Sequence, residues 1–150
     1  MRYWLMKSEP EEFSIDALAK KKKEPWNGVR NYQARNFMRD DMKVGDGVLF
    51  YHSNCEVPGV VGLAEIVSDA YPDPTQFDPK SDYYDAGSKR EEPRWLLVEV
   101  GYKRTLKRTI TLAELKEKPE LEDFALVRKG NRLSVMPVSK NEWDLIISLE

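Results

Sequence analysis

The sequence contains very little of what supports redox or metal chemistry. Cys55 is the only cysteine and His52 the only histidine among 150 residues. One cysteine cannot form an internal disulfide, and neither residue is numerous enough for a zinc site of thiolates or imidazoles within one chain. We therefore expect neither a metal ion nor a cofactor.

Long apolar runs and a strong excess of one charge are also absent. No segment approaches the roughly 18 apolar residues that cross a membrane, and the N-terminus lacks a signal-peptide core of about 7 to 15 apolar residues. The 24 basic and 26 acidic side chains give a net charge of −2 and a pI near 5.6. The absence of a membrane-spanning run and of a signal peptide predicts a cytoplasmic protein with no membrane partner, and the charge balance argues against a broad grip on duplex DNA. Any nucleic-acid contact must come from a local basic patch.

Glycine-rich phosphate loops are missing as well. Neither G-x-x-x-x-G-K-[ST] nor G-x-G-x-x-G after a strand occurs, and the strands are not separated by regular helices. The pattern argues against a doubly wound parallel sheet. It predicts one α+β domain over 1–150, with a curved, mostly antiparallel sheet or pseudobarrel of five to six strands surrounded by short helices.

Periodicity and capping residues place the elements. Four helices are expected, with Ser14, Asn31, Thr111 and Ser139 as caps, at 15–20, 32–39, 112–118 and 140–149. Strands are expected at 3–6, 48–51, 60–67, 95–102, 126–128 and 133–137. The segment 70–93, rich in Pro, Asp, Tyr and Ser, predicts a long irregular excursion.

Aromatic rings stand beside amides, hydroxyls and guanidinium groups in two segments, 26–35 and 50–54. A binding site for a nucleobase needs this mixture of residue types, because aromatic side chains stack on the ring while donors and acceptors form hydrogen bonds with its edge. Trp26 can form one wall of such a site, and Asn31 can donate and accept at a base edge. The alternative for each is structural, as a core tryptophan and a helix cap.

Two strand ends carry further candidates. Strand alternation sends Tyr51 and Ser53 to one side and His52 to the other. Lys7 and Ser8 end the first strand and reach the same cleft if the two strands pair. A local turn bond for Ser8 and a solvated charge for Lys7 are the simpler roles.

Two arginines and one tryptophan complete the candidates for the base site. Arg30 and Arg35 can hold phosphate or stack on a base, because the guanidinium group is planar and permanently charged. The competing role is an ion pair with Asp40 or Asp41. Trp95 is a weaker candidate wall, since a strand tryptophan more often belongs to the core.

Two basic clusters can meet the phosphate backbone. Arg128, Lys129 and Arg132 bracket the turn Gly130–Asn131. The second cluster comprises Lys103, Arg104, Lys107 and Arg108. Solvated turns have the same composition, so neither cluster is specific by itself.

Five motifs in order carry a family resemblance. They are MKSEP at 6–10, WNGVRNYQAR at 26–35, the segment 45–53 ending in FYHS, PGVVG at 58–62, and the tract 71–79. This combination closely resembles the EVE domain, over essentially the whole chain. The resemblance implies a PUA-like fold related to the YTH domain, which reads methylated adenine in RNA. It further implies binding of modified bases, methylated or hydroxymethylated cytosine among them, and no established catalysis.

The residues and the resemblance together predict a non-catalytic module that captures a modified base flipped out of DNA or RNA. Ser134 is included among the predicted pocket residues because its segment resembles a family segment near the pocket. The predicted pocket comprises Lys7, Ser8, Trp26, Val29, Arg30, Asn31, Tyr51, His52, Ser53, Trp95 and Ser134. The predicted backbone contacts are Arg35, Arg128, Lys129 and Arg132.

Two other functions remain open at this level. One is a nucleic-acid hydrolase that uses His52 with Cys55, or a metal held by Asp73, Asp78, Asp82 and Asp85. No third group evidently orients the histidine, and the aspartates lack the compact spacing of a calcium site. The other is a protein-interaction domain that docks a partner on 71–84, whose acidic and aromatic composition permits it.

Overall fold

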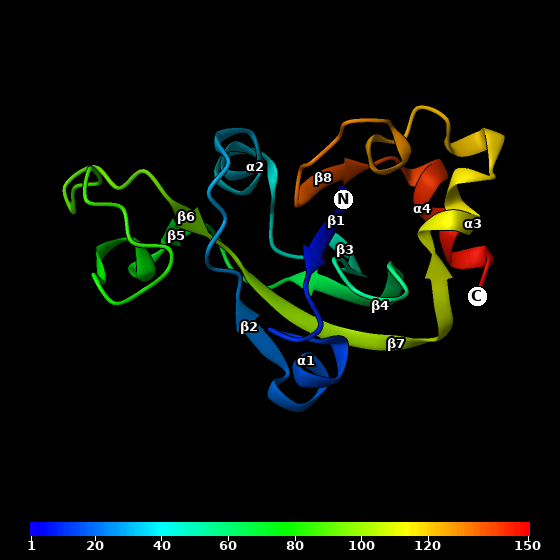
Figure 1. Ribbon diagram of the computed structural model, residues 1–150, viewed down its shortest axis with the longest axis horizontal. Coiled ribbons are helices and arrows are strands. Elements are labelled where there is room, and N and C mark those ends of the chain that lie inside the picture. The colour runs from blue at the N-terminus through cyan, green and yellow to red at the C-terminus, as the bar shows by residue number, and fades with distance from the viewer.

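A curved six-stranded sheet forms the centre of the computed structural model, which describes residues 1–150 (Figure 1). The strands are β1 (Tyr3–Ser8), β2 (Lys23–Pro25), β3 (Gly47–His52), β4 (Gly59–Ile66), β7 (Glu99–Thr111) and β8 (Val135–Val138). Their order is β2-β7-β4-β3-β1-β8. Only β1 and β3 run parallel. The predicted α+β fold with a curved, mostly antiparallel sheet is confirmed.

Four short helices pack around this sheet, and each begins at a capping side chain. They are α1 (Ile15–Lys21), α2 (Tyr32–Asn36), α3 (Leu112–Lys116) and α4 (Lys140–Ser148). Ser14, Asn31, Thr111 and Ser139 each accept a hydrogen bond from a backbone N–H of the first turn, as predicted. A π-helical turn, Phe37–Asp41, continues α2. None of the helices has the length and hydrophobicity that a bilayer crossing requires.

Side chains pack on both faces of the sheet, so the buried middle parts of β1 and β3 are apolar on both faces. Trp4 and Met6 of β1 join one hydrophobic cluster, whereas Leu5 between them joins the other. The cluster with Trp4 includes residues of α1 and α2, and the cluster with Leu5 includes residues of α3 and α4. Figure 1 shows α2 and the α3–α4 pair on opposite sides of β1 and β3.

Two predicted strands differ in kind from the structure. The expected strand 95–102 is two strands in two sheets, since β6 (Leu96–Leu97) pairs with β5 (Tyr71–Pro72) while β7 pairs with β4. β7 continues to Thr111 through a charged stretch that hides its strand character. The segment expected as a strand at 126–128 instead contains a 3-10 turn, Ala125–Val127.

Candidate nucleic-acid interface

A cavity of about 700 Å³ opens beside the C-terminal end of β1. We name it the Trp26 cavity. Its lining includes these predicted site residues: Lys7, Ser8, Trp26, Val29, Arg30, Ser53, Arg132 and Ser134. The sequence therefore identified much of the wall of one open cavity.

Strand pairing brings the polar part of this wall together. β1 and β3 pair in parallel, with Lys7 opposite Tyr51 and Ser8 opposite His52. Beyond the end of β3, the Ser53 N–H donates to the Ser8 carbonyl at 3.0 Å. On the other edge of β1, the Lys7 N–H donates to the Ser134 carbonyl at 2.8 Å. Backbone hydrogen bonds thus hold four polar residues of the cavity in place.

Trp26 lines the cavity and also belongs to the core. Its side chain is 8% exposed, and its ring meets Phe50 edge to face at a centroid distance of 5.5 Å. Val29, equally buried, packs in the same cluster. Trp26 therefore offers a small apolar surface to the cavity while most of its ring is held by the core.

Arg30 uses all its N–H donors inside the protein. The guanidinium donates to the Val29 and Tyr83 carbonyls, to the Thr75 hydroxyl and to the Asp73 carboxylate, in five hydrogen bonds of 2.8 to 3.1 Å. A guanidinium has five N–H groups, so none remains for a phosphate in this arrangement. The expected ion pair with Asp40 or Asp41 is wrong for Arg30, since its carboxylate partner is Asp73.

Asp73 explains why this arginine is held so firmly. Its side chain is fully buried, and it accepts hydrogen bonds from the backbone N–H groups of Gly28 and Thr75 at 2.8 Å each, besides that from Arg30. Gly28 has a φ of +84°, and its backbone lies against the ring of Tyr83. These contacts fasten the loop after β2 onto the excursion 70–93.

Tyr83 is the main wall residue that the sequence did not identify. It lines the cavity together with Glu9, Glu12 and Asp82. Burial, with nearby carboxylates, raises the pKa of the Tyr83 phenol, so its O–H stays protonated at neutral pH. From the sequence, Tyr83 belongs to the segment 71–84, for which a protein-docking role is one alternative. Only its contact with Gly28, a residue far away in the chain, brings it to the cavity.

Asn31, Trp95 and Arg35 lie outside the Trp26 cavity. Asn31 caps α2, where its side-chain oxygen accepts from the Ala34 N–H at 2.9 Å. The Trp95 ring stacks on Tyr32 at 4.9 Å and its indole N–H donates to Asp85 at 2.8 Å. Arg35 covers the other ring of that stack, with its guanidinium 4.8 Å from the Tyr32 centroid. These three residues brace the loop and the excursion.

His52 caps the start of α1. Its Nε2 atom accepts a hydrogen bond from the Ile15 N–H at 3.1 Å, which requires the neutral ring. Burial lowers the pKa of His52, partly offset by the carboxylate of Asp16. No hydrogen bond joins His52 to Cys55, and no three His, Cys, Asp or Glu side chains are grouped to hold a metal ion.

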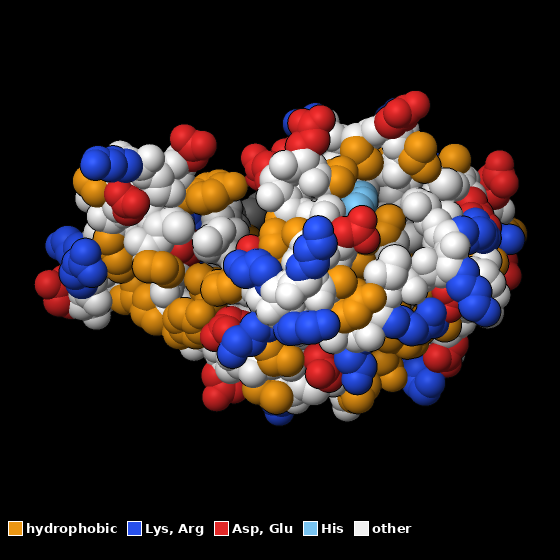
Figure 2. Space-filling model, turned by 90° about the horizontal axis from the view of Figure 1, so that it is seen from below, with side chains coloured by type: hydrophobic (Ala, Val, Ile, Leu, Met, Phe, Trp, Pro, Cys, Tyr) orange, Lys and Arg blue, Asp and Glu red, His pale blue; other side chains and the backbone are white.

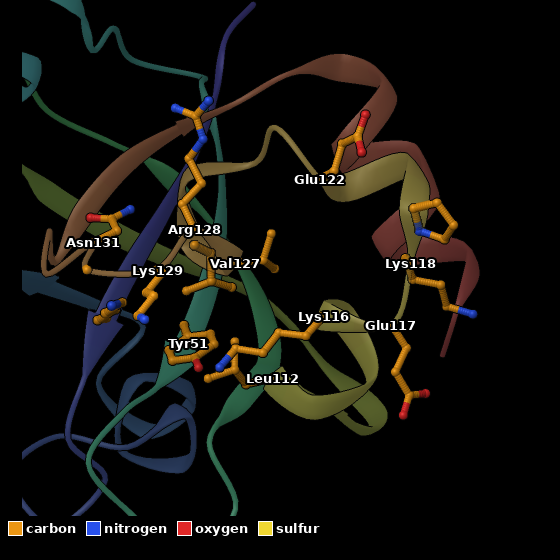
Figure 3. A pocket seen from close by; sticks show the side chains of 14 residues that line it. Tyr51, Leu112, Lys116, Glu117, Lys118, Glu122, Val127, Arg128, Lys129 and Asn131 are labelled. Carbon is orange, nitrogen blue, oxygen red and sulfur yellow. The ribbon is translucent and has the colours of Figure 1, made fainter.

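Tyr51 faces a second cavity, of about 720 Å³, on the other side of Lys7. Arg128 and Lys129 line it, and Lys7 is the one residue that lines both cavities. We name it the Tyr51 cavity (Figure 3). The expectation that Tyr51 and Ser53 share a pocket is wrong, because Ser53 lies beyond the end of β3, where the regular alternation stops.

Apart from Arg30, which pairs with Asp73, the cations that line the two cavities are free of ion pairs. They are Lys7, Lys116, Lys118, Arg128, Lys129 and Arg132. In the other basic cluster, three of four members are paired: Lys103 with Glu65, Arg104 with Glu150 and Arg108 with Glu114. Figure 2 shows acidic and basic side chains interspersed on the lower face, where β7 and α1 lie in Figure 1. Unpaired positive charge therefore lies at both cavities, whereas most of the second cluster is neutralised.

Comparison with known proteins adds independent findings. A family model described as "EVE domain" matches residues 2–149. Mouse thymocyte nuclear protein 1 is 47% identical over 167 residues, which cover 99% of this chain and 73% of the mouse protein. A Pseudomonas syringae protein of known structure superimposes with a TM-score of 0.95 at 50% identity, covering 98% of each chain. Human THYN1, solved in complex with 5-methylcytosine containing DNA, superimposes with a TM-score of 0.93 at 43% identity, covering 99% of this chain and 97% of the human one.

These names correct the predicted location. The mouse, human and rat relatives are each named as a nuclear protein. The expectation of a cytoplasmic protein is therefore wrong. It rested on the absence of a targeting signal from the sequence, and such an absence does not assign a compartment.

Proposed function

Because the chain belongs to the EVE domain family, we propose that it binds DNA containing a modified cytosine, without catalysing a reaction. The bound DNA of the human relative supports this ligand class, since that chain superimposes over 97% of its length. RNA carrying the same modification is the competing polymer.

The observation that carries the proposal is the mixed lining of the Trp26 cavity. Trp26 and Val29 supply apolar surface, while Ser8, Ser53 and Ser134 supply groups that donate and accept hydrogen bonds. A base inside a duplex cannot enter such a concave site, so the nucleotide must be extruded. The fully engaged Arg30 holds the wall in place and leaves base contact to its neighbours.

Selectivity for the methyl group follows from the apolar part of the lining. Burying one methyl against Trp26 and Val29 stabilises the complex by about 0.8 kcal/mol, which corresponds to about a fourfold difference in affinity. The polar groups check the identity of the base, because a mismatched edge leaves buried donors without acceptors. We therefore expect modest preference for methylation and stronger preference for the base itself.

We assign the phosphate contacts to the loop that follows the 3-10 turn Ala125–Val127. Arg128, Lys129 and Arg132 extend from this loop at the border of the two cavities and carry no ion pair. Arg35 donates only three hydrogen bonds within the protein, so two of its five N–H groups stay available. Contacts of this kind fix the position of the strand and carry no sequence information.

The test is a titration of short oligonucleotides that differ only in one base. Cytosine, 5-methylcytosine, 5-hydroxymethylcytosine and N6-methyladenine are compared in DNA and in RNA, by fluorescence anisotropy at one salt concentration. We expect tighter binding to modified cytosine in DNA, weaker discrimination between cytosine and adenine in Ser134→Ala, and intact oligonucleotide after incubation. Equal affinity for every base would overturn the proposal, and cleavage that requires His52 would favour a hydrolase.

A further inference from the structure

The Tyr51 cavity is a separate space that shares a boundary with the Trp26 cavity. Residues of α3, of the 3-10 turns Pro119–Leu121 and Ala125–Val127 and of the loop 128–131 surround the end of β3 there. Lys7 stands between the two cavities and lines both. A strand of nucleic acid whose base occupies one cavity would therefore lie close to the other.

Three amines gather around Tyr51. The Lys7 Nζ atom lies 5.8 Å from the centroid of the Tyr51 ring. Figure 3 shows the side chains of Lys116 and Lys129 extending toward the same ring from opposite sides. None of the three forms an ion pair, although Glu117 and Glu122 also line the cavity. In Figure 3 both glutamates are turned away from Tyr51.

The Tyr51 hydroxyl is a fourth donor at this place. Its side chain is 2% exposed, and its oxygen has no hydrogen-bond partner within the protein, yet that oxygen is not sealed from the cavity. Burial, with a smaller contribution from Cys55, raises the pKa of Tyr51 to about 12. The phenol therefore keeps its proton at neutral pH and donates a hydrogen bond.

We infer that the Tyr51 cavity is a phosphate site, held by the Tyr51 hydroxyl and the amines of Lys7, Lys116 and Lys129. Phosphate oxygens accept hydrogen bonds, and their negative charge would complement three lysine amines that have no carboxylate partner. On the proposed function, on which this step rests, the phosphate belongs to the DNA backbone beside the captured base. The same chemistry would hold the phosphate of a free nucleotide.

Salt dependence separates this site from base reading. Each phosphate contact releases counterions, so its loss lowers the slope of log affinity against log salt by about one. The double variant K116Q/K129Q and the single variant Tyr51→Phe are compared with Lys43→Gln. Lys43 is exposed, unpaired and precedes β3, at the end opposite Tyr51.

The site predicts a shallower salt slope for K116Q/K129Q and weaker binding for Tyr51→Phe, each to the same extent for methylated and unmethylated DNA. Lys43→Gln should behave as the wild type. Unchanged slope and affinity in K116Q/K129Q would overturn the phosphate site, even if the preference for methylcytosine persists and the proposed function stands.

A second experiment distinguishes a DNA phosphate from that of a free nucleotide. It remains informative even if the protein does not bind DNA. Inorganic phosphate and 5-methylcytidine monophosphate are titrated while backbone amide shifts of Tyr51 and Lys116 are followed by NMR. Shifts that vanish in K116Q/K129Q support the site with a free nucleotide as ligand, even if no oligonucleotide binds. Absence of shifts together with unchanged DNA binding would refute it.

Discussion

Arg30 ties two loops together because each of its N–H donors has an acceptor inside the protein. The Arg30→Lys variant keeps the charge but supplies three donors from a single point. It leaves part of the buried Asp73 carboxylate unsatisfied, and we expect a loss of about 1–3 kcal/mol in the free energy of unfolding. Urea denaturation measures this loss.

Arg39→Lys is the matched control for that change. Arg39 pairs with Asp40 on the surface, where both side chains are largely exposed. Exposed pairs contribute little because water and salt screen them. Equal effects of the two substitutions would show that Arg30 is an ordinary surface arginine.

His52 links pH to the stability of α1. Its pKa is lowered from the ordinary value of 6.5, because burial disfavours the charged ring, an effect partly offset by the Asp16 carboxylate. The neutral ring is also the form that accepts the hydrogen bond from the Ile15 N–H. The unfolded chain then binds the proton more readily, so stability is full above 6.5 and falls as the pH drops toward the folded pKa. The urea concentration at the unfolding midpoint should decrease as the pH is lowered from about 7.5 to about 5.5.

The control is the His52→Gln variant, whose side-chain oxygen can accept the same hydrogen bond without titrating. It should flatten the pH dependence in this window. A midpoint that falls equally in both proteins would assign the effect to other groups.

At the scale of elements, the contact between the loop after β2 and the excursion 70–93 shapes the Trp26 cavity. An added Cβ at Gly28 would lie 2.6 Å from the Tyr83 ring, and the φ of +84° disfavours any side chain there. The Gly28→Ala variant should therefore displace the excursion and weaken DNA binding. We expect it to cost about 1–3 kcal/mol more than a change that only strains the backbone.

Gly45→Ala supplies that comparison. Gly45 has a φ of +96°, and an added Cβ would meet nothing within 4 Å. The two variants are compared by urea denaturation and by DNA affinity. Similar losses of stability and unchanged affinity in both would show that the Tyr83 contact does not support the site.

Local signals predicted the elements better than they predicted the site. Ser14, Asn31, Thr111 and Ser139 cap helices because the capping bond involves residues three apart. The break between β6 and β7 had no such signal, since it follows from which strand each half meets. Trp26 could be predicted as a cavity residue from its type and Lys7 from its place at a strand end. The contact of Tyr83 with Gly28 could not, because it joins segments far apart in the chain.

Over the whole molecule, ion pairing distinguishes the cations at the cavities from those on β7. The net charge is only −2, and the cluster on β7 is largely neutralised by Glu65, Glu114 and Glu150. The double variant R128Q/R132Q should therefore weaken DNA binding and lower the salt slope by about two. R104Q/R108Q removes the same charge and should leave the slope unchanged, and the reverse result would move the interface to β7.

The claim on which the account depends is that the modified base enters the Trp26 cavity. Oligonucleotide carrying a ¹³C-labelled methyl group on 5-methylcytosine allows isotope-filtered nuclear Overhauser effects to be measured in the complex. We predict transfer from this methyl group to the Trp26 indole and the Val29 methyl protons. Transfer only to other residues, or none at saturating DNA, would contradict the account.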